Sequence, residues 1–215
     1  MERDLYRLYY YPLNASMAPR FVMEAIGVEH ELVLVDRKAN AQKSPDYLAL
    51  NPAGRIPVLV AEETVVAESA AICIFLCECH PELGLIPATI QRRAKFFQWL
   101  LYLTATVQAE LMIYFYPDRY AADAIASSET KKIQGNRLAE MFALLNEELQ
   151  GKDFLLGEDL SICDYFLFML CVWADELAVP PLSFTDLKRY LTAMAQRPEI
   201  RRVCQHEGLD LSPYA

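Results

Sequence analysis

The first part of the chain alternates short apolar runs with amphipathic stretches. Runs rich in β-branched and aromatic residues predict strands at Leu5–Tyr10, Glu31–Asp36, Ile56–Val60 and Thr64–Ala67. Stretches of helical periodicity predict helices at Ser16–Gly27, Ser44–Leu50 and Ser69–Cys79. The resulting order β-α-β-α-β-β-α predicts a small mixed sheet with helices packed against it.

After Pro81 and Pro87 the strand pattern ends and only helical periodicity remains. Helices are predicted at about Ile90–Tyr114, Glu129–Gln150, Ser161–Leu177, Phe184–Gln196 and Glu199–His206. Proline or glycine residues separate them. We therefore expect an α/β domain over residues 1–84, a linker over 85–90 and an all-helical domain over 91–215.

Composition and charge narrow the class of protein. Hydrophobic residues make up 54% and charged residues 23% of the 215 residues, which is typical of a folded chain able to bury a core. The net charge is −9, with 7 basic and 12 acidic residues up to residue 84 and 13 and 17 after it. Because neither part is basic, we expect no nucleic acid and no membrane surface as partner.

The N-terminus and the cysteines indicate a compartment. The charged start Met1–Asp4 is not followed by the apolar core of a secretory signal. The longest apolar stretches, such as Phe166–Ala174, are too short to span a bilayer. The six cysteines lie mostly within helical patterns and lack the spacing of a disulfide framework or a zinc site. We expect a cytoplasmic protein with reduced thiols and no metal.

The segment that indicates chemistry is Asn51–Leu59, with Glu68 and Ser69 shortly after it. Pro57 at a strand start suits a sheet edge or a cis turn, and a cis bond would turn the backbone N–H and C=O of Ile56 outward. An extended peptide can pair with such groups as an added strand. Ser69 opens a helix whose N-terminus attracts a carboxylate, and Glu68 can accept from an ammonium group. Together these groups suit a γ-glutamyl tripeptide. Taken alone, each residue has a plain structural interpretation: Pro57 as a sheet-edge proline and Ser69 as a helix cap.

A second motif, Leu160–Tyr165, has the features of a folding element. Ser161 can cap the backbone N–H three residues on, and Asp164 can reach back to the start of the helix. Leu160 can pack on Tyr165 as a hydrophobic staple. Nothing in this capping box suggests chemistry.

These motifs, in this order, resemble the cytosolic glutathione transferases, which join a thioredoxin-like domain to a helical domain. Asn51–Leu59 resembles the family's cis-proline segment, and residues 157–164 resemble the capping box of its buried helix. The residues that the resemblance implies for binding glutathione are Ile56, Pro57, Glu68 and Ser69. The resemblance covers nearly the whole chain, and it implies glutathione as co-substrate, an apolar electrophile and a homodimer.

Within the family, Leu8–Arg20 is most similar to the bacterial beta class. The cysteine of that class falls on Ala15 here, and the serine after it falls on Ser16. A mixed disulfide between glutathione and this position therefore cannot form.

Other positions of the class also differ in this chain. The histidine and lysine that the class places on its first long helix fall near Gln108 and Ala109. The lysine of the loop after the second strand is either Lys38 or Lys43, and the sequence does not decide between them.

A glutathione transferase needs a donor that stabilises the thiolate, because a thiol with a pKa of about 8.5 is mostly protonated at pH 7. Ser16 at the first helix N-terminus is the leading candidate, Tyr10 at the end of the first strand is the second, and Asn14 ranks lower. One charge-assisted bond is worth about 1.5–3 kcal/mol, which is about one to two pKa units. Ser16 as a helix cap, Tyr10 as a strand aromatic, and no catalytic donor at all remain open alternatives.

The electrophile is expected between the two domains, against the long helix after the linker. Aromatic and soft side chains there are Tyr102, Gln108, Met112, Tyr114, Phe115 and Tyr116. The leading hypothesis is a glutathione transferase that conjugates glutathione to an apolar electrophile. The alternatives are another glutathione-dependent enzyme (an isomerase, dehalogenase or peroxidase) and a non-catalytic binding or regulatory protein on the same scaffold.

Overall fold

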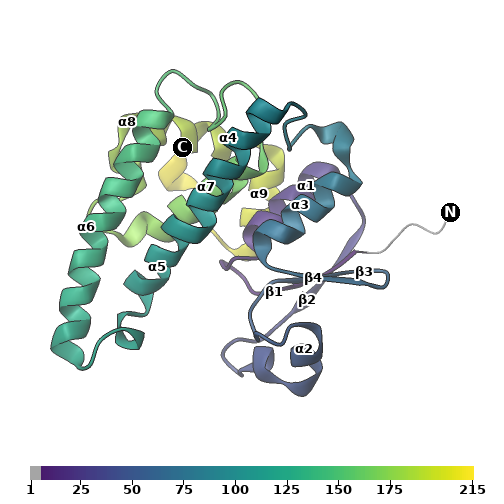
Figure 1. The fold of residues 1–215 in the computed structure, drawn as a ribbon, viewed down its shortest axis with the longest axis horizontal. Helices are drawn as coiled ribbons and strands as arrows, with labels where there is room; N and C mark the ends of the chain where they lie inside the picture. Colours follow the sequence, from purple (N-terminus) through teal and green to yellow (C-terminus); the bar gives the residue numbers. More distant parts are fainter. Residues whose placement is uncertain (1–5) are drawn as a thin grey trace. The chain divides into compact units, whose positions relative to one another are not determined.

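The computed structural model describes residues 6–215, so the interpretation of Met1–Asp4 lies outside the described residues. The chain forms two compact units (Figure 1). The first unit holds the chain up to Leu83 together with Pro198–Leu211, and the second holds Gly84–Arg197 with Ser212–Ala215. Within residues 6–215, no helix is both long enough and apolar enough to cross a membrane.

A four-stranded sheet in the order β2-β1-β3-β4 forms the base of the first unit. Its strands are β1 (Tyr6–Tyr10), β2 (His30–Leu34), β3 (Val58–Ala61) and β4 (Thr64–Ala67). β2 runs parallel to β1, whereas β3 runs antiparallel to both β1 and β4. The predicted mixed sheet is confirmed.

Helices cover both faces of this sheet (Figure 1). They are α1 (Met17–Ile26), α2 (Pro45–Leu50) and α3 (Ser69–Cys79). Successive residues of β1 point to opposite faces, as the pleat of a strand requires. Tyr10 lies against Arg20 of α1, and Tyr9 lies against Tyr47 of α2. The C-terminal end of β1 therefore places one side chain against α1 on one face of the sheet and one against α2 on the other.

The predicted ends of the first two helices are confirmed at the level of single hydrogen bonds. Gly27 ends α1 in the left-handed conformation at φ 73°, and its N–H donates to the carbonyl of Met23. Ser44 caps α2, because its hydroxyl oxygen accepts the N–H of Tyr47 at 3.3 Å. Both are the residue types that these positions favour.

The helix α9 (Pro198–Glu207) packs on α1 in the first unit, whereas the sequence pattern places it in the helical domain. Two ion pairs join these helices. Arg202 contacts Glu24 at 2.7 Å, and Glu207 contacts Arg20 at 2.7 Å. The C-terminal part of the chain thus completes the α/β unit.

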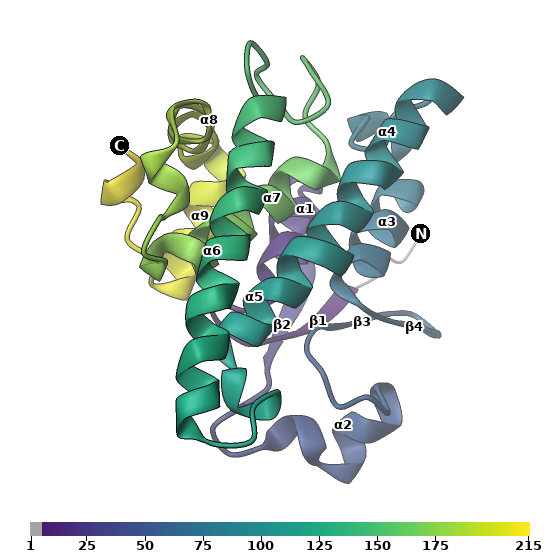
Figure 2. The same cartoon turned by 60° about the vertical axis from the view of Figure 1, so that its left-hand side comes forward.

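The second unit is helical, as predicted. Its helices are α4 (Ile90–Leu101), α5 (Gln108–Phe115), α6 (Ala124–Glu148), α7 (Ile162–Trp173) and α8 (Thr185–Ala195). Figure 2 shows the long α6 running alongside α5, with which it is in contact. The residues of α7 from Ile162 to Cys171 are all buried, so this helix forms the centre of the unit.

Several helix boundaries differ from the prediction, and local side chains account for two of the differences. The predicted helix Ile90–Tyr114 contains a π-helical segment at Tyr102–Val107, where the hydroxyl of Thr104 donates to the carbonyl of Leu100 at 2.8 Å. Such a bond competes with the regular helical ladder. The next helix begins earlier than predicted, because Asp123 accepts the N–H of Ala126 at 2.9 Å and caps it.

The predicted capping box is confirmed at the start of α7. Asp164 is fully buried, and its carboxylate accepts the N–H groups of Ser161 and Leu155, each at 2.8 Å. It also accepts the hydroxyl groups of Ser161 at 2.9 Å and Tyr190 at 3.3 Å. Burial raises the pKa of Asp164 to about 6, against the hydrogen bonds, which lower it.

Candidate functional site

Strand register brings the predicted glutathione-binding residues to one end of the sheet. Val58 at the start of β3 pairs with Tyr9 in β1 and with Ala67 in β4. The residues just beyond these pairs are the predicted ones: Tyr10, Pro57 and Glu68. The antiparallel pairing therefore places the end of β1, the segment before β3 and the start of α3 together.

The segment before β3 leaves one backbone unit free of hydrogen bonds. The Ile56–Pro57 peptide bond is cis. The neighbouring carbonyl of Arg55 accepts from the Tyr47 hydroxyl and from the Asn51 side-chain amide, each at 2.8 Å. By contrast, the N–H and C=O of Ile56 have no hydrogen-bond partner within residues 6–215. The bonds to the Arg55 carbonyl thus fix this segment, while the backbone of Ile56 stays able to pair with an extended ligand.

Glu68 and Ser69 stand at the N-terminus of α3. Glu68 is exposed and has a left-handed φ of 69°, which is rare outside glycine and costs free energy. Ser69 donates its hydroxyl to the carbonyl of Ala15 at 2.8 Å and so ties α3 to the loop after β1. In the described chain no side chain caps α3, so its first N–H groups remain available to an anion.

Ser16 is committed to the loop Tyr11–Ser16, which joins β1 to α1. Its hydroxyl donates to the carbonyl of Tyr11 at 3.0 Å, and its oxygen accepts the Tyr11 N–H at 3.4 Å. The residue is fully buried. In this arrangement the hydroxyl proton is used within the loop, which favours a structural brace. Ser16 as the thiolate donor stays a prediction.

Asn14 and Tyr10 keep free donors near the same loop. The Asn14 side-chain oxygen accepts the N–H of Ala15 at 2.7 Å, which fixes the amide group and leaves its Nδ2 without a partner in the part of the chain that is described. The Tyr10 hydroxyl likewise has no partner across residues 6–215, and its ring is largely buried. The carbonyl of Asn14 also accepts the N–H of Met17 at 2.9 Å, so Asn14 begins the turn that leads into α1. The rank of Asn14 among the donor candidates stays a prediction.

The two candidate loop lysines differ in their surroundings. Lys43 Nζ donates to the carbonyl of Ala53 at 3.4 Å and so reaches the segment that carries Ile56. Lys38 instead donates its backbone N–H to Asp36. Gly54, at φ 59°, allows the approach of Lys43, because a Cβ there would lie 2.6 Å from Nζ. The geometry favours Lys43 over Lys38.

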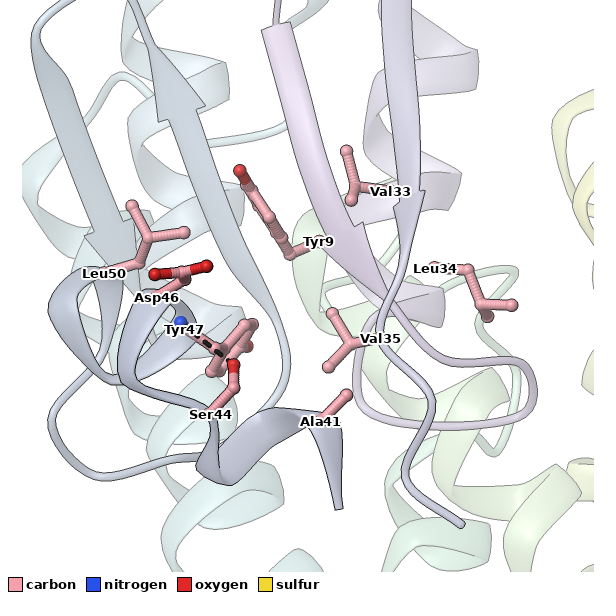
Figure 3. A pocket seen from close by; sticks show the side chains of 9 residues that line it. All are labelled: Tyr9, Val33, Leu34, Val35, Ala41, Ser44, Asp46, Tyr47 and Leu50. Atoms are coloured by element: carbon pink, nitrogen blue, oxygen red, sulfur yellow. Dashed lines mark hydrogen bonds between the residues drawn. The ribbon is translucent and has the colours of Figure 1, made fainter. Parts of the chain in front are cut away.

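A separate cavity of about 200 Å³ lies on the α2 side of the sheet (Figure 3). Its lining residues include Tyr9, Val33, Asp46 and Leu50. None of the predicted glutathione-binding or catalytic residues lines it. This hollow is therefore distinct from the candidate site.

The side chains predicted for the electrophile lie on α5 and next to it, in the second unit. All six are half-buried, so each keeps some accessible surface: Tyr102, Gln108, Met112, Tyr114, Phe115 and Tyr116. Two of the rings face cations, with Lys131 4.7 Å from the centre of Tyr114 and Arg119 4.0 Å from that of Tyr116. They form an aromatic surface suited to apolar or electron-poor groups.

The described residues include no cysteine pair joined by a disulfide and no cluster suited to a metal ion. All six cysteines are free thiols and five are buried. Burial raises the pKa of Cys77 and of Cys204 to about 12, which keeps them protonated and unreactive at neutral pH. No group of three or more His, Cys, Asp or Glu side chains within residues 6–215 is placed to hold a metal ion.

A thioredoxin-like unit with a peptide-pairing edge, followed by a helical unit, defines the glutathione transferase fold. Comparison with family models gives the same result for both parts. Residues 6–78 match the N-terminal domain of glutathione S-transferases, and residues 102–198 match their C-terminal domain. The chain belongs to the glutathione S-transferase family.

Individual relatives cover almost the whole chain. The chain is 27% identical to glutathione S-transferase GST-4.5 of Xanthomonas campestris, over 95% of this chain and all of that protein. In structure it is similar to a glutathione transferase homolog from Sulfitobacter with bound glutathione (TM-score 0.88, 24% identity, 96% and 100% covered). It is also similar to a sphingomonad glutathione S-transferase complexed with glutathione (TM-score 0.82, 26% identity, 95% and 100% covered).

Proposed function

We propose that the protein is a glutathione S-transferase that binds glutathione at this end of the sheet and transfers it to an apolar electrophile. The observation that carries the proposal is the convergence of three groups that a γ-glutamyl tripeptide needs. These are the unpaired backbone of Ile56, the exposed carboxylate of Glu68 and the uncapped N-terminus of α3. A relative of the same fold is described as complexed with glutathione.

Each of these groups has a partner in glutathione. The backbone of Ile56 pairs with the cysteinyl residue of the tripeptide in antiparallel fashion. The γ-glutamyl carboxylate lies at the N-terminus of α3, beside Ser69, and its ammonium group faces Glu68. Lys43 supplies a positive charge for the second carboxylate of the tripeptide. Pro57 keeps the adjoining position free of a donor.

Asn14 is the thiolate donor that the geometry supports best, with Tyr10 as the second candidate. The amide Nδ2 of Asn14 is free, lies one residue before Ala15 and belongs to the turn that opens α1. One such bond, with the helix N-terminus, lowers a thiol pKa by about one to two units. The thiol proton passes to water, and the thiolate sulfur forms a bond to the electrophilic carbon. The leaving group departs with its bonding electrons, or an added carbanion takes a proton from water.

Calorimetric titration with glutathione and with S-hexylglutathione tests the binding site. We expect glutathione to bind in the micromolar to millimolar range, and the S-hexyl form to bind more tightly if an apolar pocket adjoins the site. Absence of binding for both compounds would overturn the proposed function.

A variant set tests the donor once binding and turnover of a nitroaryl halide are measured. Asn14→Ala should lower kcat/KM by about tenfold to a hundredfold, as expected for about 1.5–3 kcal/mol. Full activity in Asn14→Ala with loss in Tyr10→Phe would transfer the role to Tyr10. Loss of activity in Ser16→Ala with unchanged stability would restore Ser16.

A binding or regulatory protein without turnover is the second candidate. Two observations favour it: the Ser16 hydroxyl is used within its own loop, and Gln108 and Ala109 stand where the beta class has its histidine and lysine. Glutathione binding without conjugation of any electrophile in a broad screen would support this alternative.

The resemblance also implies a homodimer in the cytoplasm. An apolar stripe on α4 supports the dimer: Ile90, Phe97 and Leu101 are 82%, 39% and 60% exposed, and Ala94 is exposed between them. Residues at this spacing share one helix face. Sedimentation of the protein should show a dimer that Phe97→Glu dissociates, and a monomeric wild type would contradict it. Free thiols are consistent with a reducing compartment.

A further inference from the structure

Glu207, at the end of α9, reaches back to the loop Tyr11–Ser16. One carboxylate oxygen accepts the backbone N–H of Leu13 at 2.7 Å. The other accepts from Nη1 of Arg20 on α1, also at 2.7 Å. The side chains of Glu207 and Arg20 are 0% and 3% exposed. A buried carboxylate is therefore shared between a helix cation and one backbone amide of the loop.

The amide that Glu207 binds belongs to an unusual backbone position. Leu13 has a φ of 54°, in the left-handed region that leucine seldom occupies, although its side chain is 44% exposed. Apolar burial of the side chain thus contributes little to holding this conformation. The hydrogen bond from Leu13 to a buried charge can hold it, because such bonds are short and strong. Asn14, the proposed donor, is the next residue.

The same cluster also surrounds Tyr10. The guanidinium carbon of Arg20 lies 5.3 Å from the centre of the Tyr10 ring, and the His206 ring lies 6.3 Å from it. Arg20 Nη1 is also 3.4 Å from Nδ1 of His206. The end of α9 therefore contacts both sides of the loop, at the last residue of β1 and at Leu13.

We propose that Glu207 is a positioning residue, which fixes the backbone of the loop at Leu13 and so orients the Asn14 amide toward the glutathione sulfur. The loop-fixing part stands on the geometry alone, whereas the orientation of the sulfur ligand rests on the proposed function. Glu207 touches neither substrate nor reacting atoms in this scheme; it acts through the loop.

The chain contains a matched control for this role. Arg202 and Glu24 form the other described ion pair between α9 and α1, with the same 2.7 Å separation. Arg202 also donates to the Glu24 carbonyl at 3.3 Å. Its hydrogen-bond partners within residues 6–215 lie on α1 and none lies in the loop, so Arg202→Gln removes a link between the helices without touching Leu13.

Hydrogen exchange of the Leu13 amide in the full-length protein gives the first test. We expect slow exchange in the wild type, at least tenfold faster exchange in Glu207→Gln, and the wild-type rate in Arg202→Gln. Should Glu207→Gln fold poorly, Glu207→Asp keeps the buried negative charge but shortens the side chain by one methylene and so weakens the bond to Leu13. Unchanged exchange at Leu13 in a folded Glu207 variant would overturn the loop-fixing role.

The second test compares kcat with KM and follows the pKa of bound glutathione by the pH dependence of kcat. Glu207→Gln should lower kcat about tenfold and raise the pKa of the bound thiol, with little change in the KM for the electrophile. Arg202→Gln should leave all three near the wild-type values. Faster exchange with unaltered kcat and thiol pKa would overturn the positioning role. If the wild type binds no glutathione, the proposed function fails, and exchange at Leu13 alone decides the loop-fixing part.

Discussion

The N-termini of α3 and α7 both carry a serine and a carboxylate, but the two helices use them differently. At α7 the hydroxyl of Ser161 and the carboxylate of Asp164 are buried and bonded to each other and to the backbone. At α3 the hydroxyl of Ser69 bonds to Ala15 in another segment, and the carboxylate of Glu68 is exposed. A serine and a carboxylate therefore satisfy the backbone groups at the start of α7, whereas at α3 they leave the first N–H groups without a side-chain cap.

The difference separates a folding element from a candidate binding site. Satisfied buried polar groups stabilise a unique packing and have no capacity left for a ligand. At α3 the uncapped helix N-terminus can attract an anionic group of a ligand, and the exposed carboxylate beside it can attract a cationic group. The contrast predicts that substitutions at α7 change stability, whereas substitutions at α3 change binding.

The largest effect is expected for Asp164→Ala, which leaves the buried N–H groups of Leu155 and Ser161 without acceptors. The free energy of unfolding should fall by about 3–5 kcal/mol in urea denaturation. The control Asp159→Ala removes an exposed partner of Arg92 and should change stability by less than about 1 kcal/mol. Equal effects of the two substitutions would contradict the special role of the buried Asp164 carboxylate in stability.

The dependence of stability on pH gives a second test of the buried Asp164. The pKa of Asp164 is about 6 in the folded chain, compared with 3.8 as its ordinary value. Between these values the folded state holds the proton more tightly, so stability falls as pH rises from about 4 to about 6, by about 3 kcal/mol in all. Asp164→Asn should lose this dependence, which is measured as the difference between the two proteins in urea unfolding at pH 4 and pH 7. A constant difference would contradict a titrating Asp164.

At α3 the expected effect is on affinity. Glu68→Gln should weaken glutathione binding about tenfold, because it removes the charge that faces the ligand ammonium, and it should leave the unfolding free energy within about 0.5 kcal/mol. The exposed Glu63, in the turn between β3 and β4, gives the control Glu63→Gln with unchanged affinity. Calorimetry on both variants makes the comparison, and a Glu68→Gln protein with wild-type affinity would remove Glu68 from the site.

The smallest effect is expected for Ser16→Ala. It removes the bond to the Tyr11 carbonyl and should lower the unfolding free energy by about 1 kcal/mol while keeping most of the turnover. Thermal unfolding and a conjugation assay on one preparation give both numbers. The reverse result, with stability kept and turnover lost, would place Ser16 with the catalytic groups.

The local elements of this fold were predictable because short-range patterns determine them. The capping box at Ser161, the stop at Gly27 and the strands around Pro57 each depend on neighbours within a few residues. The placement of α9 was not predictable, since the partners Arg20 and Glu207 are 187 residues apart in sequence. An amphipathic pattern shows that one face of a helix is buried, but it does not show which element covers that face.

The candidate site was predictable in part for the same reason. Its binding residues fall in contiguous motifs, and strand pairing carries them to one sheet end. The donor could not be assigned, because a serine at a helix start can cap, brace a loop or face a ligand. The partner of the hydroxyl, here the carbonyl of Tyr11, favours the brace, and the Ser16→Ala variant tests it.

The first unit is assembled from both ends of the chain, since α9 joins α1. During synthesis on the ribosome, Arg20 is therefore made long before the carboxylate that neutralises it. The loop at Leu13 gains its acceptor only when α9 has emerged. A gene fragment ending at residue 84 would encode the whole sheet and every proposed glutathione contact, but it would leave Arg20 without Glu207. The backbone of this loop is thus completed only after Glu207 has been synthesised.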